Sequence, residues 1–113
     1  MKVISVNDAK PYNPPLHNAM VALKLCDANL CDAQQFWCGL SHFLPGGGAQ
    51  WAYEDSPTEK LYVVLEGAIT VRTKVETRVV SKGEAVFLSP FEGREVINHT
   101  NYPVSMLVIA RNQ

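Results

Sequence analysis

Short apolar segments alternate along the chain with proline, glycine and other turn-forming residues. The intervals between these breakers span roughly 5–12 residues, a length typical of strands and too short for most helices. Apolar residues at the helical spacing i, i+3, i+4, i+7 do not persist beyond about two turns. The pattern predicts an all-β sandwich or closed barrel. The expected strands, rich in β-branched and aromatic residues, are Met20–Leu25, Gln35–Leu44, Gln50–Glu54, Leu61–Leu65, Ala68–Thr73, Thr77–Val80, Ala85–Leu88, Arg94–Asn98 and Val104–Ala110.

The segment Val3–Lys10 is the one place where a short helix is expected as an alternative to a strand. No internal repeat, low-complexity segment or linker divides the 113 residues. A chain of this length falls in the range of one domain with one core. Residues 1–113 are therefore expected to form a single domain.

Alternation along two of these strands assigns side chains to opposite faces of the sheet. Lys60, Tyr62 and Val64 share one face of their strand, and Arg94 shares a face with Val96 in another. The residues between them are also partly apolar. Both faces of the sheet are therefore expected to be covered, as in a barrel that also packs against a partner chain.

Composition and charge exclude several classes of function. Ten Lys and Arg against eleven Asp and Glu give a formal net charge of −1, which offers no basic excess for a nucleic-acid backbone. The apolar runs are far shorter than a membrane span, and residues 1–10 lack the apolar region of a signal peptide. We expect a cytoplasmic protein with no nucleic-acid or membrane partner.

The three cysteines, Cys26, Cys31 and Cys38, are an odd number for a disulfide framework. Their spacing matches no common zinc motif, and no histidine pair follows at the distance that zinc fingers use. The sequence favours reduced thiols that fill space in the core.

Two stretches carry polar residues at fixed distances from glycines. The first contains Gly48, Glu54, Ser56, Lys60 and Gly67, in the spacing G-x5-E-x-S-x3-K-x6-G. This spacing, over residues 48–67, resembles the first motif of the cupin superfamily, G-x5-H-x-H-x3-E-x6-G.

The second stretch, residues 83–98, contains Gly83, Ser89, Phe91, Arg94 and Asn98. It is similar to the second cupin motif, G-x5-P-x-G-x2-H-x3-N, again without insertion. The resemblance covers about residues 20–110. It implies a single cupin barrel, jelly-roll-like, with a short N-terminal extension, and it implies a homodimer, as is common among small cupins.

The departure from the family pattern changes the expected chemistry. Cupins typically bind a divalent metal through three His and one Glu, and these positions hold Glu54, Ser56, Lys60 and Arg94 here. Two fixed cations disfavour a metal ion at this place, and imidazole, thiolate or several carboxylates are missing. We expect no metal and no cofactor. A metal-dependent oxygenase with Glu54 and His42 as substitute ligands is the less favoured alternative.

If the family geometry holds, these four side chains converge in the barrel mouth, in a pocket lined also by Tyr62, Val64, Val96 and either Trp51 or Phe91. Such a pocket is typical of a small-molecule site. Arg94 could hold a carboxylate or phosphate, and Ser56 could orient the ligand. Burial beside Arg94 lowers the pKa of Lys60 and a nearby Glu54 raises it, so the sign is open.

Three hypotheses follow for this pocket. In the first, the protein is a metal-independent isomerase, lyase or decarboxylase in which Lys60 or Glu54 transfers a proton, or Lys60 attacks a carbonyl. His42 is a further candidate acid or base if it faces inward, which strand parity leaves undecided. In the second, the protein binds a small ligand without catalysis. In the third, Glu54, Lys60 and Arg94 form only a structural ion-pair cluster.

Overall fold

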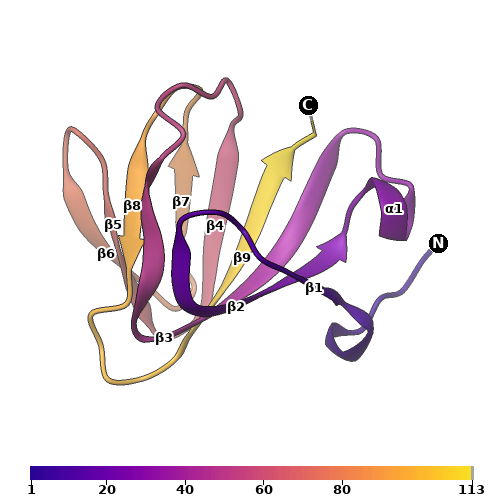
Figure 1. Cartoon of the computed structure of the whole chain (residues 1–113), viewed down its shortest axis with the longest axis horizontal. Coiled ribbons are helices and arrows are strands. Elements are labelled where there is room, and N and C mark those ends of the chain that lie inside the picture. The colour runs from indigo at the N-terminus through magenta and orange to yellow at the C-terminus, as the bar shows by residue number, and fades with distance from the viewer. Residues whose placement is uncertain (113) are drawn as a thin grey trace.

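The computed structural model describes residues 1–112 and shows one antiparallel sheet of nine strands that nearly closes on itself as a barrel (Figure 1). The predicted all-β barrel of the cupin type is therefore confirmed. The strands run in the order β6-β5-β8-β3-β9-β4-β7, while β2 pairs with β3, and β1 with β2. Their bounds are β1 (Lys10–Tyr12), β2 (His17–Cys26), β3 (Phe36–Ala52), β4 (Lys60–Glu66), β5 (Ala68–Arg72), β6 (Thr77–Ser81), β7 (Ala85–Leu88), β8 (Arg94–Ile97) and β9 (Val104–Arg111).

Strand β3 differs most from the sequence-based expectation, because the predicted strands Gln35–Leu44 and Gln50–Glu54 form one continuous strand. The glycines between them were interpreted as a break. A Cβ added at Gly47 would lie 2.1 Å from the carbonyl oxygen of Ala19, and one at Gly48 would lie 2.0 Å from that of Val96. These glycines therefore permit close approach of the neighbouring backbones, and β3 continues through them.

The N-terminal segment contains both elements that were expected as alternatives. A 3-10 helix, η1 (Val6–Asp8), is followed by the short strand β1. The chain between β1 and β2 then arches across the front of the barrel in the view of Figure 1. This segment brings residues from the N-terminal extension to the barrel.

A four-residue helix, α1 (Ala28–Cys31), joins β2 to β3 and was not predicted. The side chain of Asp27 caps it by accepting hydrogen bonds from the backbone N–H groups of Asn29 and Leu30. One turn is too short to produce a helical repeat of apolar residues. No helix within residues 1–112 is long and apolar enough to cross a membrane.

The cysteines lie around this connection and are free thiols. Cys26 and Cys38 are partners in the register of β2 and β3. All three are only half-buried, so the expectation that they fill the core is wrong. They sit at the end of the β2–β3 hairpin, next to α1.

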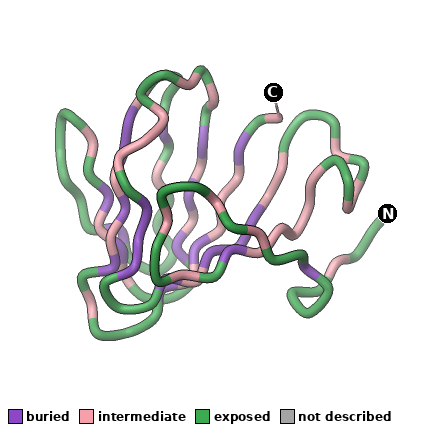
Figure 2. Tube along the Cα trace, viewed as in Figure 1, coloured by how far each residue is buried: buried purple, intermediate pink, exposed green. Residues whose placement is uncertain are grey.

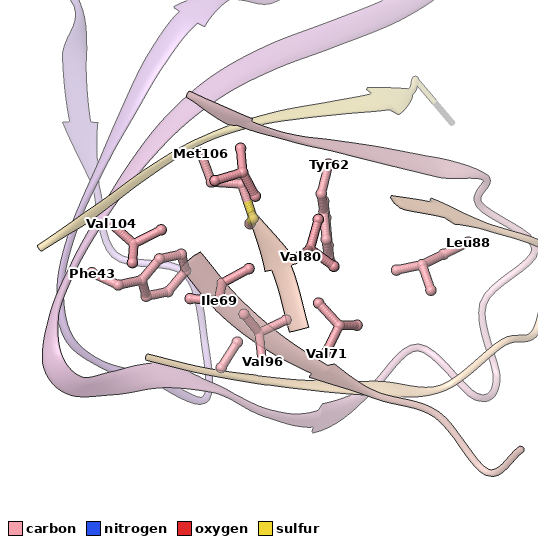
Figure 3. Packing of buried hydrophobic residues seen from close by; sticks show 11 residues of the cluster. Phe43, Tyr62, Ile69, Val71, Val80, Leu88, Val96, Val104 and Met106 are labelled. Atoms are coloured by element: carbon pink, nitrogen blue, oxygen red, sulfur yellow. The ribbon is translucent and has the colours of Figure 1, made fainter. Parts of the chain in front are cut away.

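The core fills the barrel between the two curved halves of the sheet, and Figures 2 and 3 show its buried strand positions and side chains. The predicted inward faces are confirmed, since Lys60, Tyr62 and Val64 are buried on β4. Asn98, the last residue of the second motif, is also fully buried. Its Nδ2 donates hydrogen bonds to the backbone oxygens of Phe43 (3.1 Å) and Tyr102 (2.8 Å), which fixes the β8–β9 connection to β3.

Candidate functional site

A cavity of about 410 Å³ lies inside the barrel, with walls from β3, β4, β8, β9 and the segment between β1 and β2. Its lining is mostly aromatic and aliphatic, and a few polar groups converge in it. This volume and lining are those of a small-molecule site.

Arg94 begins β8 and is only 2% exposed. Its Nε donates a hydrogen bond to the phenolic oxygen of Tyr62 (2.8 Å), and its Nη1 donates one to the backbone oxygen of Gln50 (2.9 Å). Two elements on different sides of the cavity therefore fix the plane of the guanidinium.

Lys60 begins β4 and is 4% exposed. Its Nζ donates a hydrogen bond to the backbone oxygen of Thr58 (3.4 Å) and lies 3.5 Å from the centre of the Tyr53 ring. The Cζ of Arg94 lies 4.8 Å from the centre of the same ring. One tyrosine ring thus contacts both buried cations.

The backbone of Tyr53 is left-handed, with φ of 74°. This conformation is uncommon for a residue with a bulky side chain and costs free energy. Tyr53 follows directly after β3, so the turn of the chain at this residue is what directs its ring to the two cations.

Lys60 and Arg94 have no acidic partner within residues 1–112. No Asp or Glu side chain of the described chain lines the cavity, and neither cation takes part in an ion pair there. Burial, together with the smaller effect of the charge of Arg94, lowers the pKa of Lys60 to about 8. The direction of the pKa shift of Lys60, which the sequence left open, is therefore downward.

Tyr12 and His17, which also line the cavity, carry shifted pKa values. Burial raises the pKa of Tyr12 to about 12, with additional contributions from Tyr53 and Tyr62. Burial also lowers the pKa of His17, aided by the charge of Arg94 and opposed by a hydrogen bond between its Nδ1 and the backbone oxygen of Pro15 (2.7 Å). Both side chains are therefore held more firmly in their neutral forms.

Of the residues selected from the sequence, Lys60, Tyr62, Arg94 and Val96 line the cavity together. Glu54 does not join them. Its side chain is exposed, forms an ion pair with Lys74 and accepts a hydrogen bond from Nε1 of Trp51 (3.1 Å). These two partners hold the pKa of Glu54 below its usual value.

Four other sequence-selected side chains also lie outside the cavity lining. Trp51 stacks with the guanidinium of Arg72 at 4.9 Å, and Phe91 is exposed. His42 faces away from the barrel interior, where its Nδ1 lies 2.9 Å from the Oγ of Ser105. Val64, also expected in the lining, is buried in the core.

Ser56 lies in the loop between β3 and β4, and its contacts are with this loop and the next. Its backbone oxygen accepts a hydrogen bond from the N–H of Phe91 (2.7 Å), and its Oγ accepts one from the N–H of Thr58 (3.3 Å). Ser56 therefore positions the loop that carries Tyr53 and Thr58.

Sequence reasoning missed several lining residues, and the reasons differ. His17 and Tyr12 belong to the proline-rich N-terminal segment, and no local pattern of residues places that segment at the barrel. Tyr53 lay in an expected strand and reaches the cavity only through its left-handed backbone. Trp37 lines the cavity from the start of β3 and contacts the Tyr12 ring edge-to-face at 6.4 Å.

The residues at the cupin metal positions do not fit a divalent metal ion. Lys60 and Arg94 direct positive charge into the cavity, while Glu54 and Ser56 lie outside its lining. Within residues 1–112, no group of three His, Cys, Asp or Glu side chains is placed to hold a metal. A cation beside two fixed cations and without anionic ligands is electrostatically disfavoured.

Comparison with known proteins gives the family of the fold. A cupin-domain model matches residues 39–110. A protein described as a beta-D-galactosidase from Mycobacterium tuberculosis (strain ATCC 25618 / H37Rv) is 32% identical over 110 residues, which covers 96% of this chain and 91% of that protein.

Solved structures of low identity share the fold. The polyketide cyclase RemF from Streptomyces resistomycificus has a TM-score of 0.87 at 23% identity, over 100% of this chain and 80% of its own. A sugar phosphate isomerase of the cupin superfamily from Silicibacter pomeroyi has a TM-score of 0.82 at 15% identity, over 99% and 76%. At these identities the likeness concerns the fold alone.

Proposed function

This chain belongs to the cupin family, and we propose that its barrel binds a small anionic metabolite, a carboxylate or phosphate that also carries a carbonyl group, without a metal ion. In this proposal Arg94 holds the anionic group and Lys60 transfers a proton. The reaction is of the isomerase, lyase or decarboxylase type.

The observation that carries the proposal is the pair of buried cations, Lys60 and Arg94, without an acidic partner in the described chain. Burying a charge is costly unless an opposite charge lies beside it. An anion in the cavity would supply that charge for both side chains at once. The structural ion-pair cluster expected as an alternative needs Glu54 beside the cations, and Glu54 pairs with Lys74 instead.

Lys60 has the properties of a general base near neutral pH. A pKa of about 8 leaves a substantial fraction of its amine unprotonated, and general acid–base catalysis is most efficient when the pKa is close to the working pH. Its Nζ lies at the cavity wall, where a bound carbonyl compound can be reached.

The activity named for the Mycobacterium tuberculosis relative suggests glycoside hydrolysis as a second candidate. The rings of Tyr12, Trp37 and Tyr53 in the lining are suitable for stacking on a sugar. Most glycosidases, however, use two carboxylates that flank the scissile bond. No Asp or Glu of residues 1–112 lines this cavity, so we favour the anion.

The test compares melting temperatures of the protein with lactate, pyruvate, inorganic phosphate, galactose and an uncharged amide of lactate. We expect the anions to raise the melting temperature and the uncharged compounds to leave it unchanged, because a ligand that binds only the folded state stabilises it. Arg94→Gln should weaken anion binding roughly 30-fold or more. Arg94→Lys keeps the charge and loses the paired N–H donors of the guanidinium, so it should retain part of the affinity for anions.

Lys74→Gln is the matched control, since this lysine is exposed and pairs outside the cavity. Equal stabilisation by lactate and its amide would overturn the proposal. Stabilisation by galactose alone, with hydrolysis of a chromogenic galactoside, would replace it by the second candidate. Saturable anion binding without any product from carbonyl-bearing anions would assign the protein to the non-catalytic binding modules.

A further inference from the structure

We infer that Lys60 acts as a nucleophile and forms an imine with a short 2-oxo or 3-oxo acid whose carboxylate is held by Arg94. This inference rests on the proposed function and names its substrate class. It assigns to Lys60 a covalent step in addition to the transfer of a proton.

The structure places an amine and an anion-binding group in the wall of one cavity, in contact with the same aromatic ring. Lys60 and Arg94 both lie against the ring of Tyr53, at 3.5 Å and 4.8 Å from its centre. In a short oxo acid the carbonyl carbon lies one or two bonds from the carboxylate carbon. The two ring distances put Nζ of Lys60 and Cζ of Arg94 no more than 8.3 Å apart. A short oxo acid can span such a gap with its carboxylate on the guanidinium and its carbonyl group at the amine.

The surroundings of Lys60 favour its neutral, nucleophilic form. No carboxylate of residues 1–112 faces its Nζ, and the neighbouring charge is that of Arg94. The other polar side chains of the cavity lining include one further cation, Arg111, and otherwise neutral groups: Tyr12, Asn13, His17, Trp37, Ser41, Tyr53, Thr58, Tyr62 and Asn112. With a pKa of about 8, the unprotonated fraction at pH 7 is roughly 300-fold larger than for a lysine of ordinary pKa.

The step balances as follows. The lone pair of Nζ attacks the carbonyl carbon, so that a C–N bond forms and the C=O π bond breaks. The oxygen then takes up the proton that the nitrogen loses. The resulting hydroxyl leaves as water after a second proton transfer, and the C=N bond forms. A protonated imine can then accept the electron pair of a neighbouring bond, so that a 3-oxo acid would release carbon dioxide and a 2-oxo acid would lose a proton from the adjacent carbon.

The other lysines provide matched controls on the same molecule. Lys74 is exposed and forms an ion pair with Glu54, and Lys82 is exposed and lies 2.9 Å from a carboxylate oxygen of Glu66. Their amines lie in solvent beside a carboxylate, and neither residue lines the cavity. Any adduct at Lys74 or Lys82 therefore measures non-specific modification.

The experiment incubates the protein with pyruvate, or with acetoacetate, in the presence of sodium cyanoborohydride, which reduces an imine to a stable secondary amine. Peptide mass spectrometry then locates the adduct. We expect about tenfold or more adduct at Lys60 than at Lys74 or Lys82 at neutral pH. Lactate, which has the carboxylate and lacks the carbonyl, should give no adduct and should suppress the one from pyruvate.

Lys60→Arg separates the covalent step from the charge, because it keeps the cation and cannot form an imine. It should retain lactate binding and lose the adduct, whereas Lys74→Arg should keep both. Lactate binding without a preferred adduct at Lys60 would overturn the inference and leave the proposed function standing. If no anion binds, both the proposed function and this inference are wrong.

Discussion

The Nε of Arg94 donates a hydrogen bond of 2.8 Å to the phenolic oxygen of Tyr62, and both side chains are almost fully buried. The two residues are 32 positions apart and come from β8 and β4. In the order of the sheet β3 and β9 lie between these strands, so the bond crosses the barrel interior. Arg94 thereby acquires a fixed orientation in the cavity.

Replacing Tyr62 by Phe removes this acceptor and leaves the Nε–H of a buried cation without its partner. We expect a loss of about 1–3 kcal/mol in the free energy of unfolding, measured by urea denaturation. Tyr102→Phe, at an exposed tyrosine, is the control and should change stability by less than about 0.5 kcal/mol. A stability equal to that of the parent protein would show that the bond contributes nothing.

Lys60→Met should stabilise the fold at neutral pH. The pKa of Lys60 falls from 10.5 to about 8 on folding, so between these values the unfolded chain binds more protons, and the stability contribution of this group rises with pH. Below pH 8 the buried charge is a cost of roughly 1–3 kcal/mol. The variant should exceed the parent by that amount at pH 7, and the difference should shrink towards pH 10.5.

The measurement is a set of urea unfolding curves from pH 6 to 10.5 for the parent, Lys60→Met and Lys74→Met. The difference between the parent and Lys60→Met isolates Lys60 from the tyrosines, which titrate in both. A difference that is constant across this range would show that Lys60 titrates normally.

Glu54→Gln should leave anion binding unchanged within about twofold. The carboxylate pairs with Lys74 and Trp51 and does not line the cavity, although its place in the first motif made it a candidate for proton transfer. Isothermal titration with lactate compares this variant with Lys60→Met. A large loss of affinity in Glu54→Gln would place this side chain at the ligand.

Addition or removal of a divalent metal ion should not change the melting temperature of the protein. Protein purified without an affinity tag should contain less than about a tenth of an equivalent of any transition metal by plasma mass spectrometry, because two buried cations stand at the family's ligand positions. Treatment with a chelator, or addition of Zn²⁺ or Mn²⁺, should leave the melting temperature unchanged. A stoichiometric amount of metal would contradict the interpretation that Lys60 and Arg94 exclude a metal ion from these positions.

The protein is expected to be a homodimer that buries the outer face of β2 and β3. Val21 is the register partner of His42 and therefore lies on the same face, and Phe36 shares that face by strand parity. Val21 and Phe36 are about half exposed, which is unfavourable for large apolar side chains in water. Light scattering should give twice the mass of the chain, and Val21→Asp should shift it to that of one chain.

Sequence reasoning succeeded where strand alternation and motif spacing decide the answer. The inward placement of Lys60, Tyr62 and Arg94 follows from period-two alternation in strands whose bounds were predicted within one or two residues. It failed at Glu54, which lies beyond the end of β3, at Ala52. Alternation no longer applies there, and the left-handed backbone of Tyr53 reverses which side chain enters the cavity.

The contribution of the N-terminal segment could not be predicted for a different reason. Tyr12 and His17 reach the cavity because β1 pairs with β2 and β2 with β3, and such long-range pairings leave no local pattern in the sequence. His17 follows the proline-rich stretch 11–15 and precedes the predicted strand Met20–Leu25, so strand alternation was not applied to it. Its position depends on the tertiary structure alone.

Strand β9 (Val104–Arg111) pairs with β3 on one edge and with β4 on the other, although β3 and β4 follow each other in the chain. Without β9, therefore, no strand pairing joins β4 and β7, the part of the barrel that carries Lys60, to the part that carries Arg94. Closing such distant segments is slow, because the chain loses entropy before the contacts are made. The cavity is consequently complete only after β9 has paired with both strands, and a chain that lacks β9 leaves the apolar interior of both parts exposed.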